Sequence, residues 1–66
     1  MQEIIKLAHE LENELTSIYN EIEVAQDKGF VYARAKNIRK FAQSIKLIAH
    51  DLRQVTTDEF KNAHKE

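Results

Sequence analysis

Apolar side chains recur along the first half of the chain at alternating steps of four and three residues. The line consists of Ile4, Ala8, Leu11, Leu15, Ile18, Ile22 and Ala25. An α-helix turns once in about 3.6 residues, so this spacing holds the line on one helix face. Ile5, Leu7 and Tyr19 flank the line and widen it. The pattern predicts a helix over residues 2–28.

A stop signal follows in the sequence Asp27-Lys28-Gly29-Phe30. Glycine accepts backbone conformations beyond a helix end that other residues resist, and an apolar residue after it can pack back on the last turn. We therefore expect the first helix to end near Lys28, with a turn at residues 29–30.

The second half repeats the same rule and predicts a helix over residues 31–55. Its line consists of Val31, Ala35, Ile38, Ala42, Ile45, Ala49 and Leu52. The alanines recur every seven residues, and small side chains in one row let a neighbouring helix approach closely. Phe41, Ile48 and Val55 form a further apolar row beside the line, which we expect to face water in a lone hairpin.

The expected fold is therefore all-α: one domain over residues 1–66, in which two long helices form an antiparallel hairpin. Exposed apolar strips of this length usually mark an interface, so we expect a homodimer that forms a four-helix bundle with coiled-coil packing. The predicted dimer interface consists of Ala35, Ile38, Phe41, Ala42, Ile45, Ile48, Ala49, Leu52 and Val55.

The heptad pattern breaks after Val55, at Thr56-Thr57-Asp58-Glu59. Thr56 with Glu59 three residues later has the form of a capping box, which predicts a short third helix over residues 57–65. Continuation of the second helix is the alternative, and the sequence leaves both open.

Composition supports long helices and association. The 66 residues include no proline, no cysteine and a single glycine. A chain this short buries only about 60% of the surface that it exposes when unfolded, and without disulfides it usually needs another source of stability such as a partner copy. No apolar run suffices for a signal peptide or a membrane span. We expect a soluble cytoplasmic protein with no membrane partner.

The net charge of −1 conceals a division along the chain. Residues 1–27 contain seven acidic residues against Lys6 alone, whereas residues 28–55 contain seven basic residues against Asp51 alone. Within the basic half, Arg39, Lys46 and Arg53 are seven residues apart and form one column about 21 Å long, at 1.5 Å of rise per residue.

Two interpretations of the column are open. With Lys36 and Lys40 on the adjoining surface, it could follow a phosphate backbone. It could instead meet Glu14 and Glu21, which are also seven residues apart and flank the core line of the first helix, because opposite charges beside a heptad core fix partner and orientation. Spacing alone favours the second interpretation.

Catalytic chemistry finds little support in the sequence. It contains no glycine-rich phosphate loop, nucleophile elbow or paired-histidine metal motif. His9 and His50 fall at similar heights in a hairpin, but each lies on the flank of its helix, where a solvated side chain is the usual case. We expect no enzyme, cofactor, bound metal or small-molecule substrate.

The run from Arg39 to Arg53, RKFAQSIKLIAHDLR, together with Lys28-Gly29, resembles the hairpin region of the bacterial linker-histone-like family. These are small nucleoid-associated proteins of chlamydiae and the Bacteroidetes group, and the resemblance covers residues 15 to 64. Phe30-Val31-Tyr32 replaces the family's small basic turn, and the chain lacks the lysine-rich tail and basic charge that members often carry.

The resemblance implies a histone-like protein of the nucleoid that binds DNA without sequence preference. It assigns phosphate contact to Lys36, Arg39, Lys40, Lys46 and Arg53. The alternative function is a small helical bundle that docks a protein partner, with no binding of nucleic acid. That partner would contact either the row of Phe41, Ile48 and Val55 or the acidic first helix.

Overall fold

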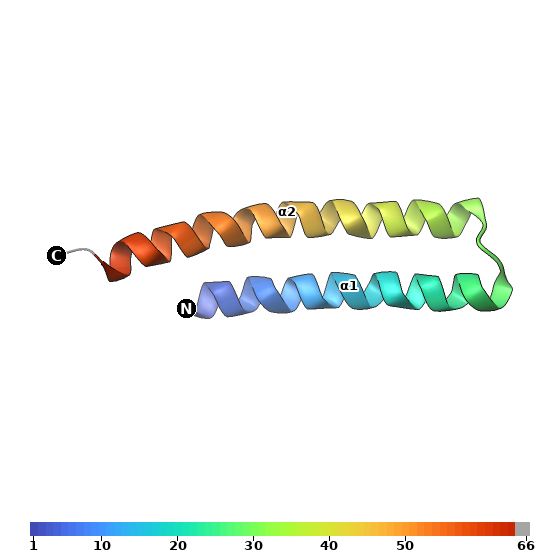
Figure 1. The fold of residues 1–66 in the computed structure, drawn as a ribbon, viewed down its shortest axis with the longest axis horizontal. Coiled ribbons are helices and arrows are strands. Elements are labelled where there is room, and N and C mark those ends of the chain that lie inside the picture. Colours follow the sequence, from blue (N-terminus) through green and yellow to red (C-terminus); the bar gives the residue numbers. More distant parts are fainter. Residues whose placement is uncertain (65–66) are drawn as a thin grey trace.

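Two antiparallel helices make up the computed structural model, which describes residues 1–64. Helix α1 spans Gln2–Lys28 and helix α2 spans Tyr32–Ala63, and they lie side by side along their lengths (Figure 1). The molecule measures 57 × 15 × 10 Å, and the start of α1 and the end of α2 lie at the end of the rod opposite the turn. No strand occurs among residues 1–64, so the prediction of an all-α helical hairpin is confirmed.

The turn between the helices depends on Gly29. Its backbone has φ 103° and ψ 149°, a conformation that residues other than glycine rarely adopt. The Gly29 N–H donates to the carbonyl of Ala25 over 2.8 Å and closes the last turn of α1. Val31 is then extended, with φ −97° and ψ 168°, and leads directly into α2. The chain thus reverses within residues 29–31.

Helix α2 continues without a break past residue 55 to Ala63. The Thr57 hydroxyl donates to the Arg53 carbonyl over 3.0 Å, which is the local bond that a threonine inside a helix makes. The structure therefore has the continuation of α2 rather than a separate short helix capped by Thr56. Residue 65, the last of that expected helix, lies outside the described residues.

The seam of α1 against α2 keeps four members of the predicted line, which are half-buried, and differs from the line at the other three. The four are Ile4, Leu11, Ile18 and Ala25. Ala8, Leu15 and Ile22 belong to that line but are exposed, and their places facing α2 are taken by the residues one position earlier, Leu7, Glu14 and Glu21. Leu7, at 6% exposure, is the one apolar side chain among residues 1–64 that is fully buried. The seam is narrow, and part of it is polar.

On α2, the row of Phe41, Ile48 and Val55 is half-buried, as are Ile38, Ile45 and Leu52. The expectation that this row faces water in a lone hairpin is wrong. Of the nine residues in the predicted dimer interface, Ala42 is exposed, and the rest are half-buried within one chain. Half-burial leaves part of each side chain open, so the prediction that these residues contact a second copy stays a prediction.

Candidate nucleic-acid interface

The five predicted phosphate-contacting residues lie together on the outward face of α2. Successive residues of a helix are about 100° apart, so a residue two positions before another lies nearly opposite it. Arg39, Lys46 and Arg53 precede the half-buried Phe41, Ile48 and Val55 in this way. Lys36 and Lys40 lie two positions either side of the half-buried Ile38. All five side chains are exposed and directed away from α1.

These five side chains have no acidic partner in the described part of the hairpin. Among residues 1–64, the ion pairs are those of the Met1 ammonium with Glu59 and of Arg34 with Glu21. The five charges on the outward face of α2 therefore remain available to a ligand of opposite charge.

Glu21 has a structural role on the seam. Its Oε2 accepts from Arg34 Nη1 over 2.9 Å and its Oε1 accepts from Asn37 Nδ2 over 3.3 Å. Glu14 also faces the seam, where its Oε2 is buried and has no hydrogen-bond partner. Within one chain, neither carboxylate meets the column of Arg39, Lys46 and Arg53, so the interpretation that pairs them with this column does not describe the single hairpin.

The two long edges of the hairpin carry opposite charge. Glu12 and Glu23 lie two positions from the half-buried Glu14 and Ala25, so both point outward from α1. The outward face of α2 carries the five basic residues. A polyanion is attracted to the edge formed by α2 and repelled from the edge formed by α1, which restricts how it can approach.

Sequence reasoning missed Lys61 as a member of this face. Because α2 continues to Ala63, Lys61 lies two positions after the half-buried Glu59 and is exposed on the same side as Lys46 and Arg53. The signal was present in its spacing of eight residues from Arg53, but it depended on knowing that the helix continues.

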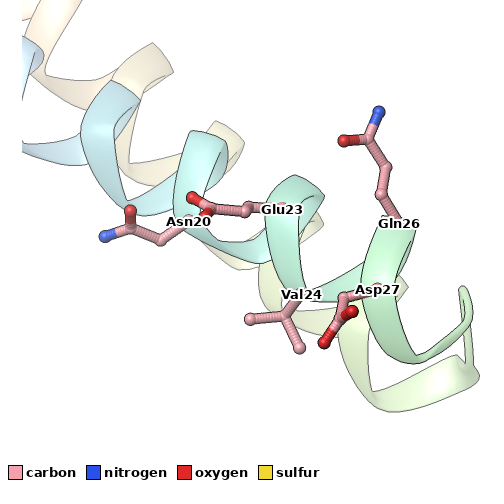
Figure 2. A pocket seen from close by; sticks show the side chains of 5 residues that line it. All are labelled: Asn20, Glu23, Val24, Gln26 and Asp27. Atoms are coloured by element: carbon pink, nitrogen blue, oxygen red, sulfur yellow. The ribbon is translucent and has the colours of Figure 1, made fainter.

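An open depression near the turn end of α1 is no competing site. It is lined by Asn20, Glu23, Val24, Gln26 and Asp27, all from one helix (Figure 2). The labelled side chains diverge from the helix and do not converge on a common point. His9 and His50 are exposed, and residues 1–64 contain no group of three or more histidine and acidic side chains that could hold a metal ion.

Comparisons add no relative from which a function could be transferred. No family model, no curated protein and no solved structure matches the chain. Neither described helix is long and apolar enough to cross a membrane. The features of the molecule that bear on function are therefore the hairpin and the distribution of charge over its two helices.

Proposed function

We propose that this chain is a non-enzymatic, histone-like protein of the nucleoid that binds the DNA phosphate backbone without sequence specificity. It acts as a homodimer in which two hairpins form a four-helix bundle. One observation carries the DNA-binding proposal: five exposed basic side chains share the outward face of α2 and have no acidic partner within residues 1–64.

The chemistry of this face suits phosphate rather than bases. Lysine and arginine on long side chains neutralise phosphates, and such contacts carry no sequence information. Gln43 and Gln54, exposed on the same side of α2, add neutral donors for backbone oxygens. The net charge of −1 and the acidic edge of α1 oppose a polyanion, so binding is expected to be weak.

Salt dependence tests this proposal directly. Five phosphate contacts give a slope of about −4.5 in a plot of log affinity against log salt, which is a loss of about 500-fold between 50 and 200 mM salt. A fluorescence titration of a short duplex at both salt concentrations measures this loss. Absence of binding at low salt, or binding that is indifferent to salt, rules the proposal out.

Charge reversal locates the binding face. Lys36→Glu with Lys40→Glu should strongly reduce binding at low salt and leave helicity unchanged, because both side chains are exposed. The matched control is Lys6→Glu with Lys28→Glu, which changes the net charge equally at two exposed positions of α1. Equal loss of binding in both double variants contradicts a localised face and indicates an effect of net charge alone.

A helical bundle that docks another protein, with no binding of nucleic acid, is the second candidate. Leu15, Tyr19 and Ile22 are 44%, 62% and 38% exposed on α1, and such an apolar surface favours association. A different protein that co-purifies with the chain, together with failure to bind DNA at low salt, would favour this function.

A further inference from the structure

The hairpin has an apolar face on one side, and the proposed contacts with DNA do not account for it. On α1 it is the row of Ala8, Leu15 and Ile22, which Met1 extends at the residue before the helix; these four are seven residues apart and all exposed, with Ile5 and Tyr19 beside the row. On α2 it is a row of small residues with the same spacing: Ala35, Ala42, Ala49, Thr56 and Ala63.

One hollow joins the two rows directly. At the end of the rod opposite the turn, Met1, which precedes α1, lines it with Thr56 and Ala63 of α2. Near the turn, Ile22 of the α1 row lines an apolar hollow with Phe30 and with Ile38, which lies three residues after Ala35 of the α2 row. The α1 row therefore reaches both hollows, and each hollow spans both helices.

A lone hairpin has little to hold it together. Leu7 is its one fully buried apolar residue among those described, and four large apolar residues of α1, together with Met1 before it, are more than a third exposed. Ordering a residue costs about 1–2 kcal/mol of backbone entropy, which burial of apolar surface must offset. A partner that covers the exposed rows supplies the missing burial.

We propose that a second copy of this chain covers this face, with a two-fold axis parallel to the long axis of the hairpin. Each α1 then lies on the partner's α2, and all neighbouring helices in the four-helix bundle are antiparallel. The inference rests on the homodimer of the proposed function, but it does not depend on DNA binding.

Size complementarity supports this axis. Within the hairpin, Met1 contacts Glu59 and Glu21 contacts both Arg34 and Asn37, which sets the register of α2 against α1. A two-fold axis along the rod keeps the same levels between copies. Leu15 is then level with the partner's Ala42, and Ile22 with the partner's Ala35. Large side chains of α1 thus face the alanine row of the partner's α2, which leaves room for them.

Charge complementarity selects the same axis. Glu12 lies four residues after Ala8, at the edge of the apolar face of α1, and Lys46 lies four residues after Ala42, at the edge of α2. The shared register places Glu12 level with the partner's Lys46, and Glu23 about one turn from the partner's Arg39. A two-fold axis across the rod would instead place acidic edge on acidic edge and basic on basic. Rim pairs are worth ~0–1 kcal/mol each, so they orient the dimer while apolar burial holds it.

DNA binding is compatible with this arrangement. Lys40 lies two positions before Ala42, on the side of α2 away from the partner, and Lys36 is one turn from Lys40. Arg39 and Lys46 lie at the rim, where a phosphate can replace a weakly held carboxylate. The two α2 helices occupy opposite corners of the bundle.

Solution mass of the full chain tests the covered face. By analytical ultracentrifugation we expect twice the 7.7 kDa of one chain for the natural sequence. Leu15→Lys should weaken dimerisation at least tenfold. The matched control is Leu47→Lys, because Leu47 is 59% exposed but lies two positions before Ala49, nearly opposite the alanine row. A monomeric natural chain at every concentration, or equal effects of the two substitutions, overturns the proposal.

Charge exchange tests the axis. Glu12→Lys and Lys46→Glu should each weaken the dimer severalfold, and the double variant should restore it. With the axis across the rod, each single substitution would relieve repulsion and strengthen the dimer, which would overturn our assignment. DNA binding by the double variant should stay reduced, because the glutamate at position 46 still repels DNA phosphates. Failure of the dimer and failure of DNA binding therefore give different results.

Discussion

Glu21 and Arg34 join the two helices across the seam near the turn, with the guanidinium Nη1 donating to Oε2 over 2.9 Å. The side chains are 16% and 34% exposed, so solvent competes with the pair only in part. Asn37 donates to the other oxygen of the same carboxylate. The Glu21 carboxylate on the seam therefore joins α1 to α2 through two hydrogen bonds.

Removing this carboxylate should weaken the hairpin. Glu21→Ala deletes both cross-helix bonds and is expected to lower the free energy of unfolding by about 1–2 kcal/mol, since hydrogen bonds to charged groups are worth ~1.5–3 kcal/mol and the Arg34 side chain regains some hydration. Urea unfolding followed by circular dichroism measures the change. Glu23→Ala, at an exposed position on the same helix, should change stability by less than about 0.5 kcal/mol.

Glu14 is the opposite case, because its buried Oε2 has no hydrogen-bond partner. Glu14→Leu should raise the free energy of unfolding by about 1–3 kcal/mol, since it replaces an unsatisfied polar atom by apolar surface on the seam. The melting temperature should rise accordingly. Asn13→Leu adds a similar side chain at an exposed position and should give little gain. Equal stabilisation by both substitutions would show that burial on the seam is not the cause.

Gly29 should resist substitution for a reason of conformation rather than space. A Cβ at this position would meet no atom within 4 Å, but φ is +103°. Gly29→Ala should therefore lower the free energy of unfolding by about 1–3 kcal/mol, the usual cost of a strained backbone conformation. Thermal unfolding measures this loss. Lys28→Ala, one residue earlier and inside α1, should be close to neutral.

Thr56→Ala distinguishes a continuous helix from a capped one. Thr56 lies inside α2, where alanine has the higher helix propensity, so the substitution should stabilise by up to about 0.5 kcal/mol. A threonine at an N-cap would instead cost about 1 kcal/mol when replaced by alanine. The sign of the change in urea midpoint therefore decides between the two, and a clear loss of stability would contradict the continuous α2.

The hairpin could be predicted from the sequence because steps of three and four residues are specific to helices and a single glycine interrupts them. The seam of α1 could be predicted only in part: the half-buried Ile4, Leu11, Ile18 and Ala25 belong to the predicted line, but the other half of the seam does not. Two neighbouring rows fit the same spacing, one through Ala8, Leu15 and Ile22 and one through Leu7, Glu14 and Glu21. Hydropathy favours the first row, but Arg34 and Asn37 provide donors for Glu21 in the second. Contacts between α1 and α2 therefore decide which row of α1 faces the seam, because the spacing within α1 fits both rows.

The basic face of α2, like the hairpin, could be predicted from residue spacing alone. Seven-residue spacing places Arg39, Lys46 and Arg53 in a column on any helix, whichever way its partner lies. Lys61 was missed because Thr56 and Thr57 suggest a helix start when read locally. In the structure, Val55 and Glu59 are half-buried, and Glu59 accepts from the Met1 ammonium over 2.6 Å, which favours a helix that continues past the threonines.

The reversal at residue 29 also bears on which molecule each helix pairs with. If residue 29 and its neighbours became helical, residues 2–63 would form one rod of about 93 Å, at 1.5 Å of rise per residue. Its apolar rows could then be covered only by the helices of a different chain. A short hinge of this kind is where domain swapping begins. One glycine thus separates pairing of the two helices within one chain from an exchange of halves between molecules.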